Sequence, residues 1–188
     1  MLVVFIGPPG AGKGTQARRL AADLGAPHLS TGDILRRAIE RDTPLGRQAA
    51  SFMNRGQLVP DEVVIDIVGQ RIAEPDCASG FLLDGFPRTL EQARALDELL
   101  HGRQASIDVV LELQADQEEL VRRMLNRAKE EGRADDTPEA IRQRFEVYRR
   151  QTEPLLDFYR QRKVLRTVDG TGTPDEVFAR IQACVAGK

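Results

Sequence analysis

The 188-residue sequence contains no tryptophan, two cysteines and two histidines. The isolated thiols Cys77 and Cys184 point to a reducing compartment rather than to a disulfide framework, so we expect a cytoplasmic protein. No apolar run approaches the roughly 20 residues that span a bilayer, and no secretory leader is recognisable, so we expect no membrane contact. The net charge of -2 gives no bulk attraction to nucleic acid. His28 and His101 lie outside every motif, and we assign them no chemistry.

Short apolar runs alternate along the chain with segments whose apolar residues recur every three or four positions, such as Thr89–Leu100 and Glu118–Ala128. This alternation predicts an α/β fold in one domain, with a five-stranded parallel sheet covered by helices on both faces. Ligands of such sheets bind at the carboxyl ends of the strands, so the loops after the first and third strands should face one cleft. The predicted strands are Leu2–Ile6, Pro27–Ser30, Phe81–Asp84, Val109–Leu113 and Val164–Val168.

A glycine-rich stretch, Gly7–Thr15, separates the first predicted strand from a helical segment. Strand, glycine-rich turn and helix are the context in which a Gly-x4-Gly-Lys pattern binds phosphate, because backbone N–H groups and the helix N-terminus face the anion. Lys13 can reach the outer phosphates. A generic phosphate loop has Ser or Thr directly after the lysine, whereas here Gly14 stands there and Thr15 follows. The stretch predicts the P-loop NTPase fold.

Four further motifs follow along the chain: Leu29–Arg36, Gln57–Pro60, Asp84–Thr89 and Val168–Gly172. Together with the phosphate loop, they resemble the adenylate kinases, a family of nucleoside monophosphate kinases, in the form with a short lid. The resemblance covers nearly the whole chain. It implies reversible, Mg²⁺-dependent transfer of the ATP γ-phosphoryl group to AMP, giving two ADP, with a role in adenine nucleotide homeostasis and AMP salvage. It also implies ATP, AMP and ADP as partners and a monomer as the default state.

The resemblance assigns residues to the two nucleotides. The ATP side consists of backbone and cationic groups: Gly10, Ala11, Gly12, Lys13, Gly14, Thr15, Arg123, Arg127 and Gly172. The AMP side combines a polar edge, an apolar rim and cations: Thr31, Arg36, Gln57, Leu58, Val59, Gly85, Phe86, Pro87, Arg88, Gln92, Arg133 and Arg144. The residues expected to act in catalysis are Lys13, Arg88, Arg123, Arg133 and Arg144.

The resemblance also predicts the metal site, one peptide bond and the moving parts. Asp84 is placed to hold Mg²⁺ through water, with no direct protein ligand, and the Phe86–Pro87 peptide is expected to be cis. No structural zinc is expected, since the short interval Ala128–Pro138 contains neither Cys nor His. Asp135 and Asp136 match flap carboxylates that tether the closed state. The predicted division is a core (1–29, 60–125 and 138–188), an AMP-binding lobe (30–59) and a short lid (126–137).

Thr31 and Gln92 favour AMP as the acceptor, because an amide that both donates and accepts matches the edge of adenine. Related kinases for pyrimidine monophosphates tend to carry Asn in place of Gln92 and a different residue in place of Thr31. Two alternatives therefore stay open: a UMP/CMP kinase of the same fold, and a non-catalytic module that senses adenylate. The second would typically lack part of the arginine set, Lys13 or Asp84, all of which are present here.

Overall fold

The structure is a computed structural model that describes residues 1–131 and 136–187. A parallel sheet of five strands forms its centre, in the order β2-β3-β1-β4-β5. This confirms the predicted fold class, and each strand boundary lies within one residue of its predicted position. The strands are β1 (Leu2–Ile6), β2 (His28–Ser30), β3 (Phe81–Asp84), β4 (Val109–Gln114) and β5 (Leu165–Asp169).

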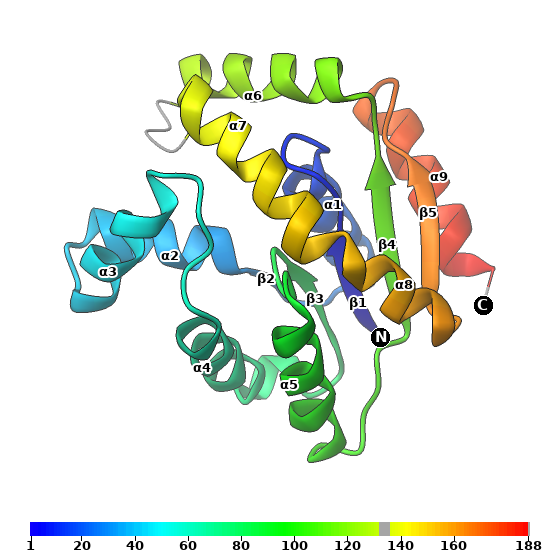
Figure 1. Ribbon diagram of the computed structural model, residues 1–188. Coiled ribbons are helices and arrows are strands. Elements are labelled where there is room, and N and C mark those ends of the chain that lie inside the picture. The colour runs from blue at the N-terminus through cyan, green and yellow to red at the C-terminus, as the bar shows by residue number, and fades with distance from the viewer. Residues whose placement is uncertain (132–135, 188) are drawn as a thin grey trace.

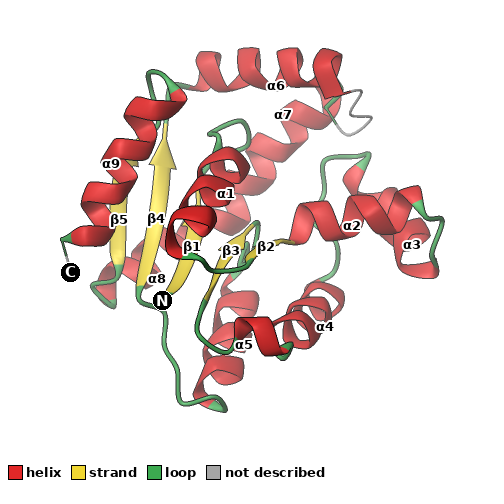
Figure 2. Ribbon diagram, turned by 180° about the vertical axis from the view of Figure 1, so that it is seen from behind, coloured by secondary structure: helices red, strands yellow, loops and turns green. Residues whose placement is uncertain are grey.

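The central strands are apolar on both faces because helices cover both sides of the sheet. Along β1, Val3 and Phe5 belong to one hydrophobic cluster, whereas Val4 and Ile6 belong to the other. Helices α1 (Lys13–Leu24) and α9 (Pro174–Ala186) contribute to the first cluster. Helices α4 (Asp61–Ile72), α5 (Leu90–His101) and α8 (Pro154–Gln161) contribute to the second. Figure 2 shows α1 and α9 lying together over one face of the sheet.

Helices α2 (Thr31–Glu40) and α3 (Pro44–Met53) project to one side of the sheet beyond β2 (Figure 1). This pair of helices fills most of the interval 30–59, which is expected from the sequence to form a lobe of its own. Ser30 caps the N-terminus of α2, because its hydroxyl accepts from the Asp33 N–H. Asp33 also complements the positive end of the helix dipole. The lobe is thus attached to the sheet directly at the end of β2.

The two helices that follow β4 lie over the carboxyl edge of the sheet (Figure 1). Helix α6 (Gln117–Glu131) runs across the top of the molecule in Figure 1, and α7 (Pro138–Val147) returns beneath it. A π-helical turn, η2 (Tyr148–Thr152), links α7 to α8, and a short 3₁₀ helix, η1 (Pro75–Cys77), precedes β3. Helix α6 therefore extends past the predicted end at Ala128, into the interval 126–137.

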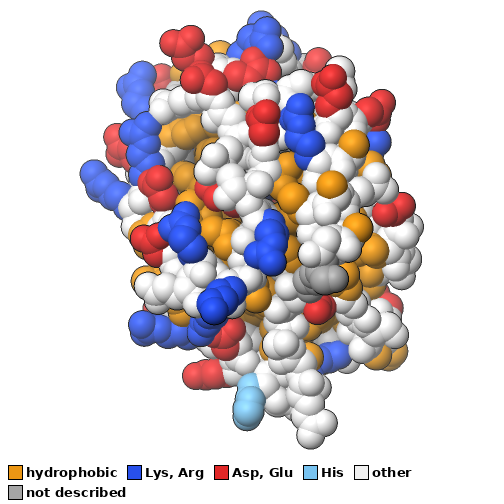
Figure 3. All heavy atoms as spheres, turned by 90° about the vertical axis from the view of Figure 1, so that its right-hand side faces the viewer, with side chains coloured by type: hydrophobic (Ala, Val, Ile, Leu, Met, Phe, Trp, Pro, Cys, Tyr) orange, Lys and Arg blue, Asp and Glu red, His pale blue; other side chains and the backbone are white. Residues whose placement is uncertain are grey.

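On the face of the molecule shown in Figure 3, acidic and basic side chains intermingle rather than forming fields of one sign. Across the described ranges 1–131 and 136–187, no helix combines the length and the apolar character needed to cross a membrane.

Candidate active site

The phosphate loop joins β1 to α1 and takes its shape from glycines. Gly10 and Gly12 have φ values of 83° and 84°, in the left-handed region that favours glycine. A Cβ on Gly10 would lie 2.6 Å from the Leu120 carbonyl oxygen, so the loop packs tightly under α6. Helix α1 begins at Lys13, and its first N–H groups have no partner within the helix. These groups and the helix dipole make the loop an anion site.

Lys13 is held over the loop by two carbonyl groups. Its Nζ donates to the carbonyl oxygen of Gly7 at 2.7 Å and to that of Pro8 at 2.8 Å. Burial is the main reason that the pKa of Lys13 is lowered to about 7. The positive charges of Arg88, Arg144 and Arg127 act in the same direction on this pKa, and Asp84 opposes them. The lysine thus lies at the centre of a cationic site suited to an anion.

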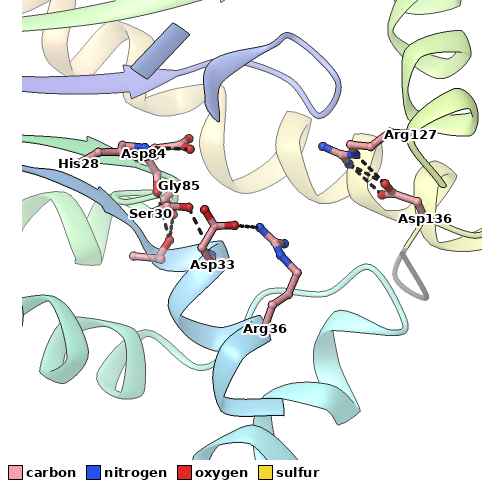
Figure 4. A network of polar contacts seen from close by, with 9 residues as sticks. His28, Ser30, Asp33, Arg36, Asp84, Gly85, Arg127 and Asp136 are labelled. Atoms are coloured by element: carbon pink, nitrogen blue, oxygen red, sulfur yellow. Dashed lines mark hydrogen bonds and ion pairs between the residues drawn. The ribbon is translucent and has the colours of Figure 1, made fainter. Parts of the chain in front are cut away.

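Asp84 ends β3 next to the phosphate loop, because Phe5 of β1 pairs with Asp84 in the sheet. A Cβ on Gly14 would lie 3.3 Å from Asp84 Oδ2, so glycine at this position lets the carboxylate approach the first turn of α1. Burial alone would raise the pKa of the Asp84 carboxyl, but His28 and Lys13 outweigh burial and lower it. The His28 Nε2 lies 3.5 Å from Asp84 Oδ2 (Figure 4). An ionised carboxylate beside a phosphate loop fits a water-mediated contact to nucleotide-bound Mg²⁺.

A cavity of about 120 Å³ lies between the phosphate loop, the α2–α3 lobe and the loop after β3. This confirms the expectation that the loops after the first and third strands face one cleft. Its lining includes ten of the residues assigned to AMP: Thr31, Arg36, Gln57, Leu58, Val59, Gly85, Pro87, Arg88, Gln92 and Arg144. Lys13 lines the same cavity.

Among the residues assigned to AMP that the structure describes, Phe86 alone is absent from this lining. Phe86 is fully buried in the apolar core, with a relative exposure of 0%. Its side chain therefore faces away from the cavity, and only its backbone is available there. The Phe86–Pro87 peptide is cis, as predicted. Arg133 lies outside the described residues, as does Asp135 of the predicted tether.

The polar groups of the cavity are held by short hydrogen bonds. The Thr31 hydroxyl donates to the Gly85 carbonyl at 2.9 Å, which leaves its lone pairs as acceptors. Gln92 Oε1 accepts from the Arg88 N–H at 2.7 Å. Gln92 Nε2 donates to Asp61 Oδ1, also at 2.7 Å. The amide of Gln92 is therefore fixed in place, with one further donor and one further acceptor position left over.

Arg36 and Arg88, both assigned to AMP, donate to oxygen atoms close to them in the sequence. Arg36 donates to the carboxylate of Asp33 at 2.6 Å, within α2 (Figure 4). Arg88 Nε donates to the Gly85 carbonyl at 2.8 Å. Both guanidinium groups line the same cavity and offer the forked geometry that matches a phosphate.

Arg127 of α6 and Arg144 of α7 meet at Asp136. Arg127 donates to both carboxylate oxygens of Asp136, at 2.8 and 3.0 Å, and Arg144 pairs with the same carboxylate. The Asp136 side chain is fully buried, whereas those of Arg127 and Arg144 are 27% and 20% exposed. Asp136 therefore connects an arginine assigned to ATP with one assigned to AMP.

Arg123 lies one turn before Arg127 and points in another direction, toward the end of β5. It donates to Glu119 at 2.8 Å and to the Gly170 carbonyl at 3.2 Å. Gly170 belongs to the Val168–Gly172 motif, which also contains Gly172 of the predicted ATP side. In this motif Gly172 has a φ of 97°, and a Cβ there would lie 2.5 Å from the Glu176 carboxylate. Arg123 does not line the cavity around Lys13; it joins α6 to the turn after β5.

Sequence reasoning missed two polar residues that support this site, His28 and Asp61. The pairing of β2 with β3 places His28 near Asp84, a signal visible only once the strand order is known. Asp61 begins α4 directly after the Gln57–Pro60 rim, and in the sequence it reads only as an acid in the first turn of a helix. In residues 1–131 and 136–187, no three His, Cys, Asp or Glu side chains gather as a metal-binding group.

A parallel sheet with a glycine loop, a buried lysine and arginines converging on one cleft defines a phosphate-loop nucleotide phosphotransferase. Comparison with known proteins narrows this class. The sequence model described as "Adenylate kinase" matches residues 5–164. The chain is 53% identical over 183 residues to an adenylate kinase of Thermus thermophilus, and the match covers 97% of this chain and 96% of that protein. It is also 53% identical over 188 residues to an adenylate kinase of Mycolicibacterium paratuberculosis, with both chains fully covered. The chain belongs to the adenylate kinase family.

Proposed function

We propose that this chain catalyses the reversible, Mg²⁺-dependent transfer of the ATP γ-phosphoryl group to AMP, giving two ADP. Membership of the family supports the reaction class, and relatives from different organisms carry the same name. The observation that carries the proposal is the cavity that joins Lys13 of the phosphate loop to Arg36, Arg88 and Gln92. One cavity then offers a donor-phosphate site, two acceptor-phosphate cations and a base-reading amide.

On the donor side, the backbone of Gly10–Thr15 and the Lys13 ammonium bind the ATP phosphates. The Gly172 turn receives the adenine, and Arg123 and Arg127 approach the phosphates from α6. When bound, Mg²⁺ neutralises charge on the β- and γ-phosphates. The ionised Asp84 carboxylate orients the water shell of that ion.

On the acceptor side, Arg36 and Arg88 bind the AMP phosphate, and Thr31 and Gln92 bind the adenine. The apolar rim formed by Leu58 and Val59 packs against the base, together with backbone groups from Gln57 and from Gly85 to Pro87. This division matches the chemistry of the cavity, which combines an apolar wall with a few convergent polar groups.

The AMP phosphate is already anionic, so the transfer needs no general base. Catalysis consists of holding the acceptor oxygen in line with the γ-phosphorus and of stabilising charge on the moving group. Lys13, Arg88, Arg123, Arg133 and Arg144 supply that charge. The lobe 30–59 and the segment 126–137 close over the nucleotides and exclude water, which strengthens these contacts and suppresses hydrolysis. The active species is a monomer, with residues of one chain forming the whole site.

The proposal is tested by ³¹P NMR of the purified protein with MgATP and one acceptor at a time: AMP, CMP, UMP, GMP or none. We expect rapid, reversible conversion of ATP and AMP into ADP, abolished when Mg²⁺ is removed with EDTA. Faster conversion of CMP or UMP would identify a pyrimidine monophosphate kinase and contradict the interpretation of Thr31 and Gln92. Nucleotide binding without transfer to any acceptor would identify an adenylate sensor instead.

A further inference from the structure

The Gln92 side chain lies in a network that fixes which end of its amide is oxygen and which is nitrogen. Its Oε1 accepts from the Arg88 main-chain N–H at 2.7 Å, and its Nε2 donates to Asp61 Oδ1 at 2.7 Å. The other Asp61 oxygen accepts from the Thr89 hydroxyl at 2.8 Å, and Thr89 in turn accepts from the Gln92 N–H at 3.1 Å. With a relative exposure of 2%, Gln92 has little freedom to leave this network.

Both partners of the amide have only one possible polarity. A main-chain N–H can only donate, and a carboxylate can only accept. A flipped amide would place its NH₂ against the Arg88 N–H and its oxygen against the Asp61 carboxylate. Each of these contacts would leave buried polar groups unpaired, which costs more than a hydrogen bond gains. The orientation of Gln92 is therefore determined by its surroundings.

We propose that Asp61 is a specificity-determining residue of the acceptor site, acting by holding the Gln92 amide in the one orientation that matches adenine. This inference rests on the proposed function. Asp61 does not touch the acceptor itself: it lies at the start of α4, behind Gln92. It is a positioning residue, and its effect reaches the nucleotide through the remaining donor and acceptor positions of the amide.

The amide orientation matters because adenine and hypoxanthine have opposite hydrogen-bond polarity at C6 and at the neighbouring N1. Adenine carries an amino donor at C6, next to ring nitrogens that accept. Hypoxanthine carries an acceptor oxygen at C6 and a donor N–H at N1, on a ring system of the same shape. With Gln92 held as in this structure, its oxygen accepts from the adenine amino group but opposes the hypoxanthine oxygen. A flipped amide would reverse that preference, so AMP and IMP are a matched pair of acceptors that reports on the orientation.

The test compares kcat/KM for AMP and for IMP, with saturating MgATP, in the parent protein and three variants. Asp61→Leu keeps the branching at Cγ and removes the acceptor. Asp61→Asn can still accept from Gln92 through its oxygen while its NH₂ donates to Thr89. Glu62→Leu removes the neighbouring acid from the same first helical turn; Glu62 is exposed and is absent from the cavity lining.

We expect the AMP/IMP ratio of kcat/KM to fall about 10- to 100-fold in Asp61→Leu, the effect of losing one hydrogen bond to a charged group. The kcat/KM for IMP should rise in absolute terms, which structural damage alone would not cause. Asp61→Asn and Glu62→Leu should keep the parent ratio. In a Gln92→Met background, Asp61→Leu should no longer change the ratio, since no amide remains to be oriented.

An unchanged AMP/IMP ratio in Asp61→Leu would overturn the inference, as would equal losses with both acceptors. Asp61→Ser, whose short side chain cannot reach Gln92, replaces the leucine variant if the latter does not fold. A parent protein that phosphorylates AMP and IMP equally well would also overturn the inference while leaving phosphotransfer intact. A parent protein that phosphorylates neither acceptor would instead contradict the proposed function.

Discussion

Binding of MgATP to the phosphate loop should take up a proton from solution, and Lys13 should be the group that receives it. Burial and neighbouring cations lower the pKa of Lys13 to about 7 in the protein without nucleotide. A bound triphosphate places negative charge beside the ammonium, which restores its pKa toward the ordinary value for lysine, about 10.4. The proton is taken up wherever the solution pH lies between these two values.

The size of the uptake follows from the two pKa values. With a pKa of about 7, about 3% of the free protein carries a charged Lys13 at pH 8.5 and about 90% at pH 6. In the complex the ammonium is charged at both pH values. The expected uptake is therefore about one proton at pH 8.5 and about 0.1 proton at pH 6. By linkage, the association constant should fall about tenfold per pH unit above pH 7.

Isothermal titration calorimetry with MgATP and no acceptor measures the uptake from the heats in two buffers of different ionisation enthalpy. The Lys13→Arg variant is the control, because a guanidinium stays charged throughout this range and has no proton to gain. Uptake below about 0.3 proton at pH 8.5 in the parent protein would refute the assignment of a lowered pKa to Lys13. Equal uptake in Lys13→Arg would show that another group accepts the proton.

Three further predictions concern single side chains. Arg88→Ala should lower kcat about 10²- to 10³-fold with an unchanged melting temperature. The control is Arg142→Ala, which changes an exposed arginine of α7. Near-normal turnover in Arg88→Ala would exclude a catalytic role for Arg88. Asp136→Leu should lower the free energy of unfolding, measured in urea, by about 3 kcal/mol, because two arginines lose a buried partner. The control is Asp157→Leu, which breaks an exposed ion pair. An equally small effect of both substitutions would contradict the prediction for Asp136. Thr173→Ala should cost about 1 kcal/mol in thermal unfolding, because it breaks the capping box of α9.

The strands and the phosphate loop could be predicted because their signals are local. Runs such as Phe81–Asp84 are buried on both faces and therefore apolar throughout, and a glycine-rich turn after such a run has few alternative meanings. The residue at which α6 ends could not be predicted from the sequence. Lys129 and Glu130 lie beyond the last apolar residue of the repeat, so the apolar spacing gives no information about them. Both residues are good helix formers, and the helix continues to Glu131.

The contacts between site residues could not be predicted, because they depend on segments far apart in the sequence. Nothing near Arg123 indicates that its guanidinium reaches the Gly170 carbonyl, 47 positions away. Likewise, the Gln92 amide meets Asp61 only because α4 and α5 pack side by side. The residue types at the site followed from local motifs. Their hydrogen-bond partners followed from packing, and only the structure supplies them.

The partners of the site cations suggest an order in which the nucleotides displace them. Lys13 donates to neutral carbonyl oxygens, whereas Arg36 and Arg127 donate to carboxylates. A phosphate oxygen is a stronger acceptor than a carbonyl, because a hydrogen bond to an ionised group is about twice as strong as a neutral one.

Exchanging a carbonyl for a phosphate is therefore favourable for Lys13 as soon as a nucleotide enters. Exchanging one anion for another gains much less for Arg36 and Arg127. These two arginines should respond only when the phosphate arrives in matching geometry or shares the cation with its carboxylate. The lysine held by carbonyls would then supply affinity for any phosphate, and the arginines held by carboxylates would supply discrimination between correctly and incorrectly placed substrates.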